Sequence, residues 1–149
     1  MNYMDEALKE AYEGISKNHG GPFGTVIVKD GKIVGRGHNQ VLSRNDPTCH
    51  GEIEAIRNAC AALKTHNLSG CELYTTAEPC PMCLGAILWA NIRKIFYGCR
   101  VSDTAEIGFR DDEFYREFES KGENFSQEFE REKCLELFAD YTERKAERY

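Results

Sequence analysis

The sequence lacks long hydrophobic runs, and none approaches the roughly 20 apolar residues that a membrane-spanning helix requires. Its first residues carry neither the basic start nor the apolar stretch of a secretion signal. Basic residues are also few, since 19 Lys and Arg stand against 25 Asp and Glu and give a net charge of −6. We therefore expect a cytoplasmic protein, with no membrane partner and with nucleic acid an unfavoured partner.

A disulfide framework is not expected either, although the sequence contains seven cysteines. The number is odd and no export signal precedes it, whereas disulfides belong to oxidising compartments. Cys80 and Cys83, separated by two residues, have the spacing of metal ligands. The other five are interpreted as structural residues, with Cys49 a special case because it adjoins a histidine.

Periodicity predicts the elements of an α/β fold. Apolar residues recur at helical spacing from Met4 to Ile15 and again from Ile53 to Leu63. A third helix, over Pro81 to Ala90, is nearly all apolar and is therefore expected to be buried. The expected strands are Phe23 to Val28, Lys32 to Gly37, Cys71 to Thr76 and Lys94 to Gly98, with Asp30-Gly31 as a tight hairpin turn and His38 to Pro47 as a polar loop.

After Val101 the pattern predicts short helices over Asp103 to Ile107 and Asp111 to Phe118, and a charged helix over Glu132 to Arg148 with Leu135, Phe138 and Tyr141 on one side. Strands separated by helices are typical of sheets that are partly parallel. We predict one domain over residues 1–149. Its fold class is α/β: a three-layer α/β/α sandwich, with a central mixed, partly parallel sheet of about five strands.

Two short motifs contain the residue types of a zinc site: His50-Gly51-Glu52 and, 30 residues later, Pro79-Cys80-Pro81-Met82-Cys83. Zn²⁺ prefers imidazole and thiolate ligands, and a catalytic site uses three of them and leaves the fourth position open. The candidate ligands are therefore His50, Cys80 and Cys83. Glu52 is the candidate catalytic proton carrier, because H-x-E followed by P-C-x-x-C is typical of zinc deaminases that act on nucleobases.

A structural zinc-binding module is the alternative from a different class. It requires a fourth ligand, for which Cys49 is the neighbouring candidate, and it has no use for Glu52. Successive residues at a helix start point about 100° apart, so Cys49 and His50 would share one metal only with strain.

The chain resembles the cytidine deaminase superfamily and, within it, small bacterial guanine deaminases. The resemblance lies in four blocks: Gly20-Gly21-Pro22-Phe23-Gly24, Asn45-Asp46-Pro47-Thr48, Glu78-Pro79-Cys80-Pro81-Met82-Cys83-Leu84-Gly85-Ala86-Ile87 and Ala105-Glu106-Ile107-Gly108-Phe109. The first three blocks are also similar to cytosine and tRNA adenosine deaminases. Gly108-Phe109 with the acidic residues after it, and the last residue, Tyr149, are the parts that resemble guanine deaminases.

The resemblance implies a zinc-dependent hydrolysis of guanine to xanthine and ammonia, in purine catabolism or salvage. It implies that Phe23 stacks on the base, Asn39 hydrogen-bonds it and Asp111 accepts from its ring N–H groups. It also implies a homodimer in which the segment from about 120 to 149 is exchanged, so that Tyr149 closes the partner's pocket.

Two departures from the resemblance leave alternatives open. Arg110 stands where an acidic residue is expected, so Asp112 is an alternative to Asp111. The segment after Lys121 is only loosely similar, so deamination of cytosine, of another nucleobase or nucleoside, or of adenosine in tRNA stays possible. Residues 110–149 contain 13 acidic and 8 basic side chains, a balance that disfavours tRNA.

Overall fold

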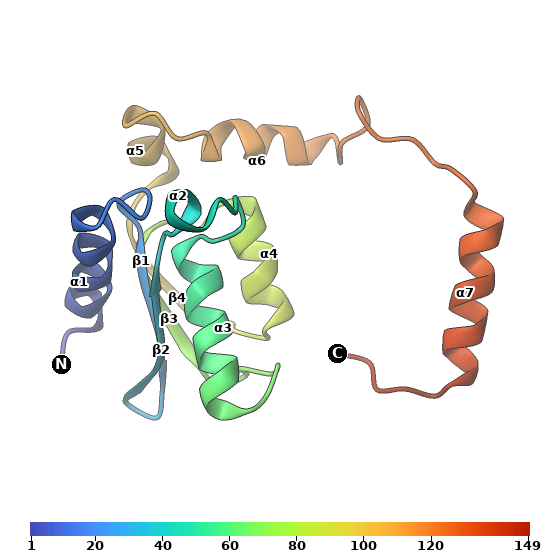
Figure 1. Ribbon diagram of the computed structural model, residues 1–149, viewed down its shortest axis with the longest axis horizontal. Helices are drawn as coiled ribbons and strands as arrows, with labels where there is room; N and C mark the ends of the chain where they lie inside the picture. Colours follow the sequence, from blue (N-terminus) through green and yellow to red (C-terminus); the bar gives the residue numbers. More distant parts are fainter.

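A four-stranded sheet lies at the centre of the structure, a computed structural model that describes residues 1–149 (Figure 1). Its order is β2-β1-β3-β4, formed by β1 (Gly24–Lys29), β2 (Lys32–His38), β3 (Glu72–Ala77) and β4 (Ile95–Cys99). β1 is antiparallel to β2 and β3, whereas β3 and β4 are parallel. The mixed sheet is confirmed, but with four strands rather than about five. The chain turns into helix α5 (Val101–Glu106) directly after β4, which remains an edge strand.

The hairpin between β1 and β2 has the predicted turn. Asp30 and Gly31 both adopt positive φ angles, 49° and 77°. Two successive residues of this kind are characteristic of the tight turns that match the twist of a hairpin, and Asp-Gly is a preferred pair for them. The turn brings His38, at the end of β2, opposite Gly24 at the start of β1.

Helices cover both faces of the sheet and confirm the three layers (Figure 1). Helix α1 (Tyr3–Ser16) packs on one face, mainly against β1 and β3, and α3 (Gly51–Leu63) packs on the other, mainly against β2. Helix α4 (Pro81–Trp89) lies beside α3. The main core lies between these two helices and the sheet, and its buried members are Ile27, Ala55, Ala59, Leu68, Cys71, Leu73, Ile87, Ala90 and Ile92.

The prediction that the apolar helix over Pro81 to Ala90 is buried is only partly correct. Within α4 only Pro81, Cys83 and Ile87 are buried, while Leu88 and Trp89 are 44% and 68% exposed. Because α4 lies at the margin of its layer, this chain covers only the side that faces α3 and the sheet. The helix therefore presents an apolar surface to its surroundings.

The remaining helices differ from expectation mainly at their ends. A short helix, α2 (Val41–Arg44), lies inside the predicted polar loop. Helix α6 (Asp111–Glu119) follows α5 and contacts it and α4. Helix α7 (Arg131–Glu143) ends five residues before the predicted Arg148. It lies on an arc that leaves the body of the protein (Figure 1), and no residue from 123 to 149 is buried. None of the helices combines the length and the apolar character needed to cross a membrane.

Candidate metal and substrate site

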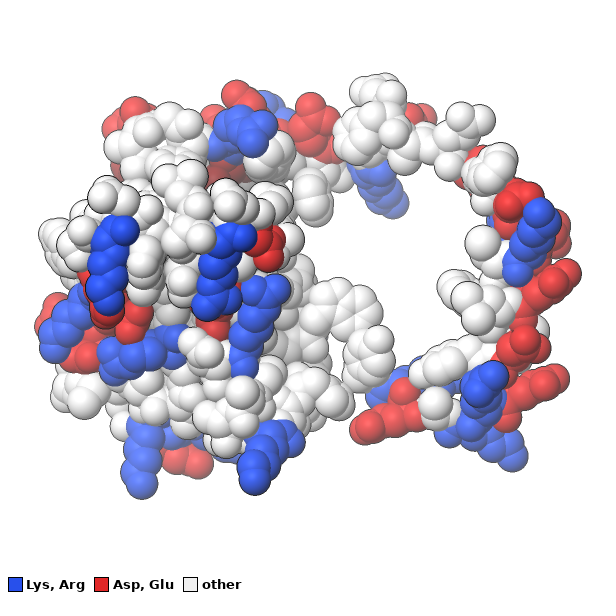
Figure 2. Space-filling view, viewed as in Figure 1, with Lys and Arg blue, Asp and Glu red and all other residues white.

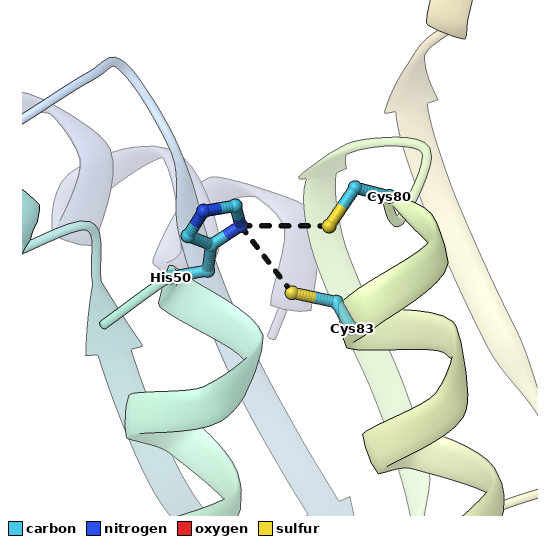
Figure 3. Close-up of side chains that lie close together, drawn as sticks. All are labelled: His50, Cys80 and Cys83. Carbon is cyan, nitrogen blue, oxygen red and sulfur yellow. Dashed lines mark hydrogen bonds between the residues drawn. The ribbon is translucent and has the colours of Figure 1, made fainter. Parts of the chain in front are cut away.

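The three predicted ligands meet where two helices begin. His50 is the residue before the first turn of α3, Cys80 precedes α4 in the same way, and Cys83 lies in the first turn of α4 (Figure 3). His50 Nδ1 lies 3.6 Å from Cys80 Sγ and 3.5 Å from Cys83 Sγ. Tetrahedral Zn²⁺ with ordinary Zn–N and Zn–S bonds separates such ligand atoms by about 3.6 Å. The donor atoms thus have the chemistry and the spacing that zinc requires.

The electrostatics of the cluster favour a thiolate. A hydrogen bond from the Cys83 thiol, with His50 as a second partner, lowers the pKa of Cys80 to about 4. The same hydrogen bond and burial raise the pKa of Cys83. The Cys80 thiolate in turn raises the pKa of His50. Both helix N-termini direct their positive ends at these groups, which further favours negative charge on the sulfurs.

Cys49 does not join the cluster. The metal-ligating atoms that lie together are those of His50, Cys80 and Cys83. The Cys49 sulfur accepts a hydrogen bond from Arg57 at 3.7 Å instead, and Arg57 also pairs with Glu54. The closed four-ligand site is therefore absent, and three protein ligands leave a coordination position for a water or a substrate.

Glu52 lies next to the ligands and is almost completely buried. Its carboxylate accepts a hydrogen bond from the Thr75 hydroxyl at 2.9 Å, and it is also hydrogen-bonded to Cys83. Thr75 is itself bonded to Thr25 at 3.0 Å. Burial raises the pKa of Glu52, since no cationic side chain compensates the lost hydration. A carboxyl group whose pKa is raised in this way holds a proton more readily than an exposed carboxylate does, which suits it to take and return one.

A cavity of about 620 Å³ opens onto the cluster and is lined by His50, Cys80 and Glu52. Its size is that of a pocket for a small organic ligand. Phe23, Asn39 and Asp111 line it as well, so the structure brings these three predicted contacts together with the ligands.

Asn39 contacts the start of α2 and also lines the cavity. Its side-chain oxygen accepts a hydrogen bond at 3.1 Å from the backbone N–H of Val41, the first residue of α2. Its amide group, which is buried, lines the cavity and has N–H donors to offer. Gly20 is in close contact with it: a Cβ at Gly20 would lie 2.0 Å from the Asn39 side-chain oxygen.

Asp111 rather than Asp112 faces the cavity. Asp111 lines it from the first turn of α6, and its partial burial, with the nearby Cys80 charge, raises its pKa. Asp112 binds Arg116 at 3.7 Å and the backbone N–H of Glu113 at 2.8 Å. Arg110 also lines the cavity, with its guanidinium 4.9 Å from the centre of the Phe114 ring.

Sequence reasoning missed the aromatic wall that α6 and the residues before it provide. Phe109 meets the Phe23 ring edge-on at 5.0 Å, and Phe114 and Phe118 also line the cavity. Phe114 and Phe118 are spaced as neighbours on one helix face, with Asp111 one turn earlier. That spacing is the signal which could have identified them. Tyr115 holds this helix over the site, because its hydroxyl donates to the carbonyl of Pro79, the residue before Cys80.

Tyr149 is the predicted contact that does not reach the site of its own chain. Its ring lies 5.8 Å from His66 and 6.0 Å from Trp89, at the far end of α4, and it is 79% exposed. A role of Tyr149 at a cavity of this protein therefore requires a second copy of the chain.

The fold and the site together define a zinc-dependent deaminase with a cytidine-deaminase-like fold. Residues 1–99 match the family described as the cytidine and deoxycytidylate deaminase zinc-binding region. The chain belongs to this family, whose members catalyse hydrolytic deamination with zinc as the cofactor.

Individual relatives are similar over different lengths. The guanine deaminase of Bacillus subtilis (strain 168) is 49% identical over 121 residues, 81% of this chain and 78% of that protein. The X-ray structure of guanine deaminase from Bacillus subtilis covers 100% of this chain and 99% of its own, with a TM-score of 0.91 and 42% identity. The tRNA-specific adenosine deaminase of Aquifex aeolicus is 43% identical over 95 residues, 64% of this chain and 62% of that protein.

Proposed function

We propose that this protein hydrolyses guanine to xanthine and ammonia. The observation that carries the proposal is one cavity in which a buried carboxylate, Glu52, adjoins the zinc-ligating set His50, Cys80 and Cys83. That combination supports replacement of an amino group by oxygen at a ring carbon flanked by nitrogen, which is the chemistry of guanine C2.

The extent of similarity favours guanine over adenosine in tRNA. Similarity to the Bacillus subtilis guanine deaminase structure extends along the whole chain, whereas similarity to the Aquifex tRNA-specific enzyme covers 64% of it. The last third includes α6, which contributes Asp111 and the aromatic wall to the cavity. The excess of acidic over basic residues in residues 110–149 also disfavours binding to the phosphate backbone of a tRNA, because nucleic-acid binding depends on Lys and Arg.

Three side chains are proposed to hold the base. Phe23, steadied by Phe109, offers a ring for stacking, and the Asn39 amide offers N–H donors to the acceptor edge of the purine. Asp111 offers a carboxylate to the ring N–H groups, because its partial burial strengthens a hydrogen bond to it.

Glu52 is proposed to carry the proton transfers. Bound zinc supplies the Lewis acid that makes water a nucleophile at neutral pH. Glu52 takes a proton from the attacking water on its carboxylate and delivers it to a ring nitrogen. It then takes the second proton, from the hydroxyl that this addition leaves on the ring carbon, and delivers it to the amino group, which departs as ammonia while the carbonyl forms. The Thr75 hydroxyl, which donates to Glu52 at 2.9 Å, keeps the carboxyl in place while its charge changes.

We also infer a homodimer that exchanges the segment from about 120 to 149. The segment leaves the body of its own chain, and Phe125, Phe129, Leu137 and Phe138 are each at least 65% exposed. Along this arm most charged side chains face outward, while uncharged atoms line much of the inner side of the arc (Figure 2). An amphipathic segment of this kind is stabilised by packing against a second surface. The apolar side of α4 in another copy, with Trp89, offers one, and Tyr149 would then serve the partner's cavity.

The proposal includes one domain over residues 1–149, working in the cytoplasm in purine catabolism or salvage. Its direct test measures ammonia release by the zinc-loaded protein from guanine, cytosine, adenine and their nucleosides, and from a tRNA substrate. Guanine is expected to give the highest kcat/KM. A higher value with any other substrate, or no release in a protein that contains one zinc per chain, would overturn the proposal.

A further inference from the structure

Three titratable side chains outside the metal site form a chain of hydrogen bonds between α1 and β2. Glu10 Oε2 lies 3.0 Å from His38 Nδ1, and His38 Nε2 lies 2.8 Å from His19 Nδ1. Glu10 and His38 are buried. The two imidazole rings are nearly parallel, with centroids 5.1 Å apart and an angle of 19° between them.

The chain has one consistent direction. The Glu10 carboxylate is an acceptor, so His38 donates to it through Nδ1–H, and the tautomer that carries its proton there has a lone pair on Nε2. That lone pair accepts the Nδ1–H of His19. Because His38 uses opposite sides of its ring for its two neighbours, the three groups do not converge on one point as metal ligands would.

The position of the His38 ring is constrained from two sides. Arg36 approaches the other oxygen of Glu10 at 3.5 Å, so the carboxylate is held at both ends. The backbone of α1 passes close to the ring, because a Cβ at Gly14 would lie 2.7 Å from a ring carbon of His38. Neither imidazole has a role in the proposed proton transfers.

These side chains join two segments of the cavity wall. Gly20 and Gly21, which line the cavity, follow His19, and Asn39, which also lines it, follows His38. The His19 carbonyl accepts the backbone N–H groups of Leu42 at 3.0 Å and Ser43 at 3.1 Å, which ties the start of α2 to the same loop. Since Gly20 is in close contact with the Asn39 side-chain oxygen, movement of either segment would move the Asn39 amide.

We propose that Glu10, His38 and His19 are positioning residues, which hold the Gly20-Gly21 and Asn39 walls at the spacing that base binding requires. None of the three touches the substrate; they act through Asn39 and the backbone of the cavity. The inference rests on the proposed function for the identity of the base, but the coupling between the two walls does not depend on it.

The test compares three variants of the zinc-loaded protein. His19→Ala removes the donor to His38. His19→Asn places an amide N–H near the position of the lost Nδ1–H and is the conservative rescue. Lys17→Ala, an exposed change in the same loop, is the matched control. Hydrogen exchange of the Leu42 and Ser43 amides reports on the wall without any substrate. KM and kcat for guanine, and the Kd of 8-azaguanine as a binding probe, report on the base.

His19→Ala is expected to speed hydrogen exchange at both amides about tenfold. It should raise KM and Kd about three- to tenfold, which is the effect expected from the loss of one hydrogen bond. The kcat should stay within about twofold of the original value. His19→Asn should recover most of the affinity, and Lys17→Ala should resemble the original protein. Unchanged exchange and KM in folded His19→Ala, or an Asn variant no better than Ala, would overturn the proposal. Faster exchange in His19→Ala, with no guanine binding or turnover by the original protein, would support the coupling and overturn the proposed function instead.

Discussion

Replacing Glu52 by glutamine changes the proton carrier and little else. Glutamine has the same shape, and its side-chain oxygen can still accept the hydrogen bond from Thr75. The three zinc ligands are untouched, so metal content should stay at about one zinc per chain. The substitution therefore separates the chemistry of the carboxyl group from the integrity of the site.

The expected loss of turnover follows from the number of proton transfers that Glu52 carries. A positioned general acid or base contributes about 10²- to 10⁴-fold to a rate. Glu52 is proposed to act first as a base toward water and then as an acid toward the ring nitrogen and the amine. No other carboxylate in the cavity is as deeply buried beside the ligands, since Asp111 and Glu78 are only partly buried. Loss of both functions predicts a fall in kcat of about 10⁴-fold or more.

Glu54→Gln is the matched control, because Glu54 lies on the same helix and is also buried. Its carboxylate binds Arg44 at 3.3 Å and Arg57 at 3.0 Å and does not line the cavity. The assay measures ammonia release from guanine together with zinc content and thermal unfolding for both variants. Glu54→Gln should lose stability and keep turnover within a few fold. A folded, zinc-loaded Glu52→Gln protein with more than about 1% of the original kcat would refute the proposed role.

Three further predictions concern the rest of the site. Asp111→Asn should raise KM for guanine about 10- to 100-fold, because a hydrogen bond to a charged group is lost. Asp112→Asn should change KM less than about threefold. Equal effects of the two substitutions in steady-state kinetics would contradict the assignment of Asp111. A second test removes zinc with a chelator. Because the pKa of Glu52 is raised in the folded protein, its favourable contribution to folding is complete below about pH 4 and is lost as the pH rises. The Glu52→Gln protein should therefore unfold at a higher temperature than the original protein near pH 7, and at a similar temperature near pH 4. A wild-type protein that gained relative stability with rising pH would contradict this sign. Deleting Tyr149 should slow turnover and weaken guanine binding without changing fold or zinc content. Mixing these shortened chains with Glu52→Gln chains should restore activity, because one site of the mixed dimer holds an intact Glu52 and the partner's Tyr149. No recovery in verified mixed dimers would exclude the exchange.

The strands and the first helices were predictable because their signals are local. The unbroken apolar run of Val26, Ile27 and Val28 and the Asp30-Gly31 turn indicate the β1–β2 hairpin within a short stretch of sequence. The predicted strands differ from the observed ones by one residue at their ends. The absence of a fifth strand was not predictable in this way. Whether a strand finds another neighbour depends on where the following segment goes, and after Cys99 the chain enters α5.

Composition alone misled the interpretation of α4. An apolar helix such as Pro81–Trp89 is buried somewhere, but the pattern does not say whether its cover comes from the same chain. Leu88 and Trp89 stay exposed because this chain covers them only in part, with the Tyr149 ring 6.0 Å from that of Trp89. The same holds for Leu135, Phe138 and Tyr141, predicted on one side of α7, none of which is buried. Intermolecular contacts leave the same sequence pattern as a core does.

The metal ligands were predictable from the sequence because the donor types and their spacing are chemically restrictive. The walls of the cavity were not, since Phe109, Phe114 and Phe118 are ordinary aromatic residues until α6 is placed across the site. Tyr115 contributes to that placement through its bond to Pro79, a contact between residues 36 positions apart. Packing of this range cannot be read from local spacing.

Two glutamates on one helix show what the structure adds to the motif. Glu52 and Glu54 are both buried in the first turns of α3, and burial of an unpaired carboxylate is costly. Glu54 offsets that cost with two arginines: Arg57 on the same helix and Arg44 on α2, so that its ion pairs join α3 to α2. Glu52 has a threonine hydroxyl and the Cys83 thiol but no cationic side chain, so its pKa is raised and its charge depends on what enters the cavity. A carboxylate that the fold leaves without a cation, beside ligands that attract one, is suited to exchange protons with a substrate rather than to stabilise the protein.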